Sequence, residues 1–141
     1  MSQRLFYAIL STVSLLIGAI LYLLYRENTH LSLFFNECFI LKSMRQCAKE
    51  IENDFLKFYF PDFLWAFSLS FGLMFVFKPK FWGGLICCLT SFLYGMLWET
   101  LQALGYIRGT GDFWDVVMYL MASLIAALIF RMRRKENEKD Y

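Results

Sequence analysis

Six polar side chains of this sequence have the types and spacing that chemistry at a membrane requires. Glu99 and Gln102 are three residues apart, and Asp112 and Asp115 repeat this spacing, so each pair would share one face of a helix. The full candidate set is Asp62, Glu99, Gln102, Arg108, Asp112 and Asp115. Partly buried carboxylates can transfer protons, and a guanidinium can bind a phosphate or carboxylate through two parallel hydrogen bonds. The set therefore predicts either acid–base chemistry or the binding of a charged headgroup.

The same residues also have a structural interpretation, which the sequence leaves open beside the functional one. Asp112 fits the N-cap of a helix and Asp115 its third position, where a carboxylate complements the helix dipole. Arg108 could pair with Glu99 or Asp115 and clamp two helices together. Asp62 directly follows a proline and is more typical of a first helical turn than of a binding site.

The placement of these residues depends on four long apolar runs. Hydrophobic residues make up 59% of the 141-residue chain and charged residues only 18%, so a soluble domain of this size could not bury its apolar surface. The runs are Leu5–Tyr25, Phe58–Phe77, Phe81–Trp98 and Phe113–Phe130. They are continuously apolar rather than alternating, which favours membrane-spanning helices over barrel strands. The small net charge of +2 argues against a nucleic-acid partner.

Basic residues predict how the helices are oriented. The turn Lys78-Pro79-Lys80 and the tail 131–141 are basic, whereas the loop 26–57 balances five basic residues with five acidic ones. We therefore expect a single membrane domain over residues 1–141, folded as an antiparallel four-helix transmembrane bundle with both termini cytoplasmic and the 26–57 loop external. The first run could instead be a secretory signal, but it is long and lacks a small-x-small cleavage site, which favours a retained helix.

The external loop and the cysteines carry further expectations. Ala48–Phe58 has the apolar periodicity of a short amphipathic helix. Cys38 and Cys47 could form a disulfide in an oxidising compartment or remain two free thiols, and both interpretations stay open. Cys87 and Cys88 are expected to pack as small apolar residues. The spacing of Cys and His fits no metal site, and no cofactor is expected. Four aromatic residues at the level of the polar set are expected to form an interfacial belt: Trp65, Trp98, Tyr106 and Trp114.

The segment from Trp98 to Tyr119 resembles the C-terminal signature of the VanZ-like family of bacterial membrane proteins. That signature reads Glu-x-x-Gln, a short loop with Arg, and an Asp-rich entry into the last helix. Here it matches Glu99, Gln102, Arg108, Asp112 and Asp115. The segment 60–66 resembles the opening of the preceding hairpin in a related group, so the likeness covers about residues 58–130. Tyr119 departs from the usual Asn, and Ala122 and Ala126 from the usual glycines.

The resemblance implies a location more than a chemistry. The VanZ-like family is associated with the bacterial cell envelope and with resistance to the glycopeptide teicoplanin, and it has no agreed biochemical activity. We therefore expect a multi-pass protein of the bacterial cytoplasmic membrane, surrounded by membrane lipid. Its polar cluster at the outer leaflet would bind a lipid-linked envelope precursor, a glycan headgroup or a partner membrane protein.

An intramembrane transferase or hydrolase acting on a lipid-linked headgroup is the alternative. In that case Glu99 or Asp115 would act as general base and Arg108 would stabilise the developing anion. Transport is disfavoured, because four helices rarely enclose a pathway alone.

Overall fold

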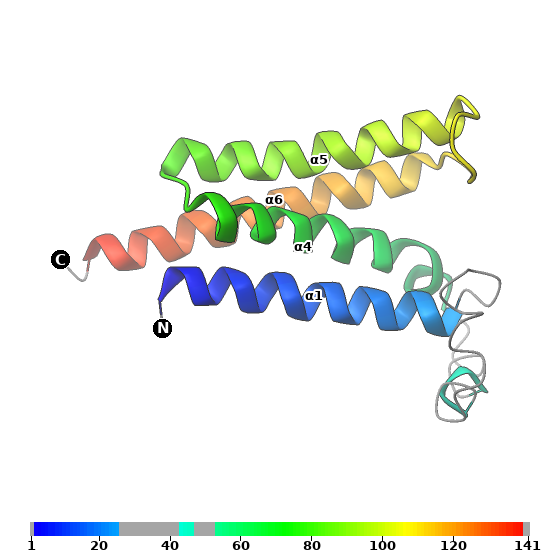
Figure 1. The fold of residues 1–141 in the computed structure, drawn as a ribbon, viewed down its shortest axis with the longest axis horizontal. Helices are drawn as coiled ribbons and strands as arrows, with labels where there is room; N and C mark the ends of the chain where they lie inside the picture. Colours follow the sequence, from blue (N-terminus) through cyan, green and yellow to red (C-terminus); the bar gives the residue numbers. More distant parts are fainter. Residues whose placement is uncertain (1, 26–42, 47–52, 140–141) are drawn as a thin grey trace.

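The computed structural model describes residues 2–25, 43–46 and 53–139, and this part of the chain is almost entirely helical. Four helices are long and apolar enough to cross a membrane: α1 (Gln3–Tyr25), α4 (Phe60–Phe77), α5 (Phe81–Ala103) and α6 (Phe113–Lys139). Figure 1 shows them lying side by side, with both chain termini at one end and the loop between α5 and α6 at the other. The expected all-helical class with four candidate membrane spans is confirmed.

A short π-helix, η1 (Phe55–Tyr59), leads into α4. Pro61 lacks a backbone N–H and its ring crowds the carbonyl four residues back, so a regular α-helical ladder cannot run unbroken through this point. The backbone takes the wider pattern instead, and the N–H of Phe60 donates to the carbonyl oxygen of Phe55, five residues earlier. The expected amphipathic helix Ala48–Phe58 lies partly outside the described residues, and its described end belongs to this π-helical turn.

The helix α5 continues one turn beyond its expected end at Trp98, and a glycine then terminates it. Gly105 has a φ of 76°, a left-handed conformation that costs little without a Cβ. Its N–H donates to the carbonyl oxygen of Gln102 at 2.9 Å, and the N–H of Tyr106 donates to that of Leu101 at 3.0 Å. These are the two bonds of a Schellman motif, which satisfies the last carbonyls of a helix and redirects the chain.

The helix α6 is longer than the sequence analysis expects. It runs through the basic segment that was expected to form a tail after residue 130 and ends at Lys139. Arg, Met, Lys and Glu are good helix formers, and cations near a helix C-terminus complement its dipole. The guanidinium of Arg133 lies 5.2 Å from the centre of the Phe6 ring, which ties this extension to α1.

The helix α4 contacts the other three helices and so occupies the middle of the fold. Hydrogen bonds from small side chains join it to its neighbours. The Ser68 hydroxyl donates to the carbonyl oxygen of Ser11 on α1, and the Ser11 hydroxyl donates to that of Ser68, both at 2.9 Å. The Ser91 hydroxyl on α5 donates to the carbonyl oxygen of Ala66 at 2.6 Å. Such bonds help to associate helices in lipid, where the hydrophobic effect between helices is weak.

The interior and the surface of the fold are both apolar. Phe71 and Met74 of α4 are fully buried, and Cys87 and Cys88 are buried in the same core, as expected from the sequence. Large apolar side chains are also exposed on outer faces, among them Leu16, Ile86 and Leu128. In a soluble protein so much exposed apolar surface would drive aggregation, whereas on a membrane-spanning helix it contacts lipid.

Candidate functional site

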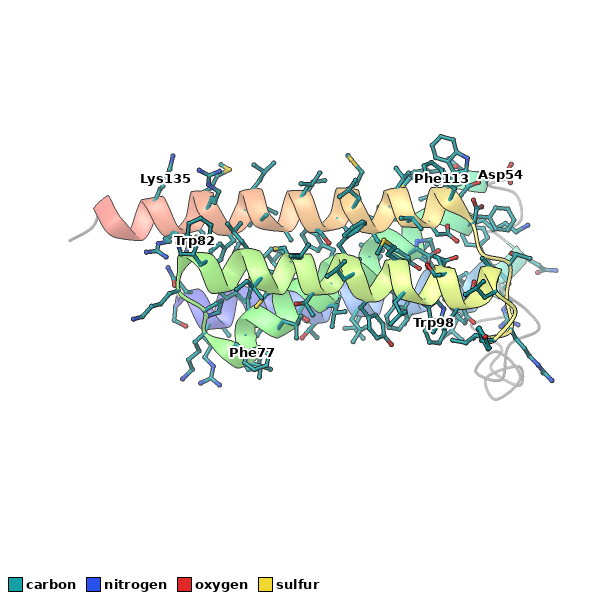
Figure 2. The ribbon with its side chains drawn as sticks, turned by 90° about the horizontal axis from the view of Figure 1, so that it is seen from above. Asp54, Phe77, Trp82, Trp98, Phe113 and Lys135 are labelled. Atoms are coloured by element: carbon teal, nitrogen blue, oxygen red, sulfur yellow. The ribbon has the colours of Figure 1, made fainter. Side chains whose placement is uncertain are left out.

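Charged side chains gather at the two ends of the helices and differ in sign. Figure 2 shows Phe77, Trp82 and Lys135 toward one end, and Asp54, Trp98 and Phe113 toward the other. We call the second the acidic end, defined by Asp62, Glu99, Asp112 and Asp115. We call the first, which also carries both chain termini, the basic end, defined by Arg4, Lys78, Lys80, Arg131, Arg133, Arg134 and Lys135.

Tyr119 is at the centre of the acidic end. Its hydroxyl donates to Oε1 of Glu99 at 3.1 Å and also lies within hydrogen-bonding distance of Oδ1 of Asp62, at 3.2 Å. The three side chains come from α6, α5 and α4, so three helices meet at one hydroxyl. Glu99 and Tyr119 are only 5% and 6% exposed, which places this contact inside the protein.

The second carboxylate oxygen of Glu99 is also occupied. Oε2 accepts a hydrogen bond from the backbone N–H of Asp112 at 3.1 Å, directly before α6 begins. The N-terminus of a helix carries a partial positive charge, so this position stabilises a negative charge. A buried charge is tolerated only where hydrogen bonds replace its hydration, and here both oxygens of Glu99 have a partner.

The two aspartates at the start of α6 have different roles. Oδ1 of Asp112 accepts a hydrogen bond from the N–H of Trp114 at 3.0 Å, which confirms the N-cap that the sequence predicts. Asp115 is half-buried and lies one turn before Tyr119, so the two share a face of α6. The negative charge of Asp115 acts on the Tyr119 hydroxyl, as do those of Asp62 and Glu99.

A glycine on α5 allows the Tyr119 ring to reach this position. A Cβ added to Gly95 would lie 2.4 Å from a carbon of the Tyr119 ring, which is closer than any real contact. Gly95 is one turn before Glu99 on the same helix, so the ring that rests on the glycine carries its hydroxyl to the carboxylate. The geometry of the site therefore depends on the missing side chain at position 95.

Arg108 does not join the cluster. Its side chain is exposed, and within the described part of the chain no hydrogen bond or ion pair joins it to Glu99 or Asp115. The structural alternative in which Arg108 pairs with Glu99 or Asp115 is therefore not seen, and Tyr119 and the main chain of Asp112 bind the two oxygens of Glu99 instead. Half-buried Gln102 contacts the loop instead, where a Cβ on Gly109 would lie 2.6 Å from its Cδ.

Other expected sites have mixed outcomes. Cys38 and Cys47 lie outside the described residues. The four aromatic residues of the expected belt are all exposed: Trp65, Trp98, Tyr106 and Trp114. Among the residues that the structure describes, no group of three or more His, Cys, Asp or Glu side chains is arranged to hold a metal ion.

In the sequence, Tyr119 is distinguished as a departure from a family pattern and not as the centre of a site. A signal for its role was nevertheless present, because Asp115 and Tyr119 are four residues apart in an otherwise apolar helix. What the sequence could not supply was the partner, since Asp62 and Glu99 are 57 and 20 residues away in the chain.

The single proton of the Tyr119 hydroxyl limits the hydrogen bonds that this cluster can form. A phenol has one proton, so the Tyr119 hydroxyl can donate to only one of the two carboxylates at a time. Carboxylate oxygens accept more than one hydrogen bond, so the cluster can also accept a hydrogen bond from a donor group of a ligand.

No protein-family model, curated protein or solved structure matches this chain.

Proposed function

We propose that this chain is a VanZ-like protein of the bacterial cytoplasmic membrane, with four antiparallel spans and both termini in the cytoplasm. Contacts between distant residues support the antiparallel order. Ser11 faces Ser68 whereas Gly18, later in α1, faces Leu64, earlier in α4. In the same way Gly84 faces Phe130 whereas Gly95 faces Tyr119. The orientation is supported by the basic end, which carries both termini and would lie in the cytoplasm, where loops rich in Lys and Arg are retained. The acidic end then lies at the outer leaflet.

We propose further that the acidic end binds the headgroup of a lipid-linked envelope precursor or a partner membrane protein. The observation that carries this proposal is the convergence of Asp62 and Glu99 from two helices on Tyr119 of a third. Polar residues at membrane depth are costly, and a cluster of them is retained where it serves a pathway or a ligand.

The sign of the cluster limits the chemistry of the ligand. Carboxylates accept hydrogen bonds and attract cations, so an ammonium or a hydroxyl group suits the cluster and a bare phosphate does not. Exposed Arg108 in the adjoining loop remains available for a phosphate or carboxylate of the same ligand. A headgroup that carries both a hydroxyl or amine and a phosphate would satisfy both parts.

The test is the tolerance of a deletion strain to glycopeptides and other wall-active agents. The strain is complemented with the wild type, Glu99→Gln, Asp115→Asn or Arg108→Lys, with membrane expression checked for each. Glutamine at position 99 can still accept the hydrogen bond from the N–H of Asp112, so this change removes the charge and keeps the fold. Thr100→Ala is the matched control, because Thr100 is adjacent to Glu99 but exposed.

We expect the wild type and Thr100→Ala to restore tolerance. Glu99→Gln and Asp115→Asn, which each remove a carboxylate, should not restore it. Arg108→Lys should restore it only partly, because lysine cannot make a bidentate contact. Full complementation by every expressed variant would show that the acidic cluster only holds the helices together and binds no ligand. A deletion without any envelope phenotype would remove the proposed role in the envelope.

A second candidate is supported by the hydrogen bond between Glu99 and Tyr119. A buried carboxylate bound to a hydroxyl is an arrangement that can move a proton during group transfer on a lipid-linked headgroup. Turnover of such a substrate by purified protein should then be lost in Glu99→Gln and in Asp115→Asn, while the variants stay folded. If both variants retain turnover, the acidic end is not catalytic.

A further inference from the structure

The basic end contains a buried hydroxyl that makes no hydrogen bond with the described residues. Tyr7 of α1 is only 4% exposed, and its Oη makes no hydrogen bond with any part of the chain that the structure describes. Burying a polar group without a hydrogen-bond partner is unfavourable, and most buried polar groups in native proteins have one. The Tyr7 hydroxyl therefore has a hydrogen-bonding capacity that no described residue fills.

Two cations of α6, Arg133 and Arg134, act on this hydroxyl. The Tyr7 ring packs against Phe130, with ring centres 6.2 Å apart. Arg133 and Arg134 follow Phe130 by three and four residues, which puts them on the same face of α6 one turn nearer the end of the helix. Their positive charges act on the Tyr7 hydroxyl. The guanidinium of Arg133 is held over the Phe6 ring, next to Tyr7 in the chain.

A third cation comes from α1 itself. Arg4 precedes Tyr7 by three residues, so it lies one turn nearer the same end. Its guanidinium lies 4.9 Å from the centre of the Phe75 ring of α4. Stacking on aromatic faces holds the guanidinium groups of Arg4 and Arg133 in place, so their positive charges stay at this end of the helices. Three helices thus contribute to one positively charged site around an unused hydroxyl donor.

We propose that this site binds the phosphate of an anionic phospholipid such as phosphatidylglycerol. The Tyr7 hydroxyl donates one hydrogen bond to the phosphate, and Arg4, Arg133 and Arg134 supply the charge. Basic sites between membrane helices recognise anionic headgroups in this way. A zwitterionic choline lipid is disfavoured, because its quaternary ammonium group would meet the arginines.

The source of the phosphate is a lipid rather than a free ion. The exposed side chains Val76 and Phe77 at the end of α4 provide an apolar surface for acyl chains at the same end of the helices. Inorganic phosphate could use the cations but would gain nothing from this surface. The proposal is independent of the acidic end, so either assignment can fail without the other.

Native mass spectrometry of the detergent-solubilised full chain tests the proposal. Bound lipid is counted during titration with phosphatidylglycerol, with phosphatidylcholine of the same acyl chains, and with phosphatidylglycerol in the presence of inorganic phosphate. The informative variants are Tyr7→Phe, which removes only the hydroxyl, and Arg133→Gln. Matched controls are Tyr94→Phe, an exposed tyrosine on α5, and Lys135→Gln, an exposed cation on α6.

We expect one tightly bound phosphatidylglycerol and an affinity at least about tenfold weaker in Tyr7→Phe and in Arg133→Gln, as is typical for the loss of a hydrogen bond to a charged group. The two controls should stay within about twofold, as charges and hydroxyls outside the site contribute little. Unchanged binding in Tyr7→Phe, equal binding of phosphatidylcholine, or displacement of the lipid by millimolar phosphate would each overturn the proposal. Arg133→Lys keeps the charge and serves as the second variant if Arg133→Gln does not fold.

Discussion

Two buried tyrosines, one at each end of the helices, show opposite solutions to the same problem. Tyr119 and Tyr7 are 6% and 4% exposed, and each carries a hydroxyl into an apolar interior. At the acidic end the hydroxyl meets two carboxylates from other helices. At the basic end the hydroxyl of Tyr7 has no hydrogen-bond partner among the described residues, although arginines lie around it.

The two ends differ in whether the hydrogen bonds of the site are made within the protein or require a bound ligand. The acidic end is closed by the protein itself, since both oxygens of Glu99 are bonded within the chain. The basic end has a donor and cations but no internal acceptor for the donor within the described residues, so an external anion would complete it. A ligand at the acidic end must therefore compete with internal hydrogen bonds, whereas one at the basic end adds bonds that were missing.

The largest effect should come from the glycines beneath the two aromatic rings of α6. Gly95 supports Tyr119 and Gly84 supports Phe130, and an added Cβ would lie within 2.4 Å and 2.3 Å of ring atoms. Gly84→Ala should cost about 1–3 kcal/mol through overpacking. Gly95→Ala should cost about 1–3 kcal/mol more, because it also moves the Tyr119 hydroxyl away from its carboxylates.

Reversible unfolding in mixed micelles, followed by far-UV circular dichroism, gives the free energies of unfolding of Gly84→Ala and Gly95→Ala. Gly72→Ala is a control, because a Cβ there would meet only the Ser11 hydroxyl, at 3.2 Å. If Gly84→Ala proves as costly as Gly95→Ala, the hydrogen bonds of Tyr119 add nothing to the packing of its ring.

The next largest effect compares the hydroxyls themselves. Tyr119→Phe should cost about 1–3 kcal/mol, because it leaves buried Glu99 and half-buried Asp62 without the donor they share. Tyr7→Phe in phosphatidylcholine should be neutral or stabilising, since it removes a buried polar group that has no partner in the protein. Unfolding in bicelles of phosphatidylcholine measures the free energy of unfolding of both variants. When the measurement is repeated in phosphatidylglycerol, we expect Tyr7→Phe to be less stable than the wild type. If both variants lose the same stability in phosphatidylcholine, the proposed difference between the two ends is wrong.

The sequence predicts the helices well because their signal is local. Continuous apolar runs and flanking charges mark four spans, and Asp112 marks the start of the last one. The ends after Trp98 and Phe130 extend further than expected, because polar residues such as Glu99 and Arg133 can continue a helix when they find partners in neighbouring elements.

The contacts within the site are less predictable, because they depend on how the helices are aligned. Gly95 and Tyr119 must lie at the same level of two helices before Glu99 can accept the hydrogen bond. Charge alone suggested a pair between Arg108 and Glu99, but the loop after Gly105 presents the main-chain N–H of Asp112 to the carboxylate instead. Charge complementarity therefore predicts the presence of a cluster and not its partners.

The smallest effect concerns the surface charges and tests whether the two ends also differ there. Arg133→Gln should cost about 0.5–1 kcal/mol in phosphatidylcholine, because the guanidinium loses its contact with the Phe6 ring. Arg108→Gln should leave the stability unchanged, since its exposed side chain has no bonded partner in the described part of the chain. Thermal unfolding of both variants beside Arg133→Met, which keeps the apolar contact without the charge, separates packing from cation–π attraction. A loss in Arg108→Gln equal to that in Arg133→Gln would mean that the loop cation is bound after all, and the acidic end would then hold a charge pair instead of a cluster kept only by its own hydrogen bonds.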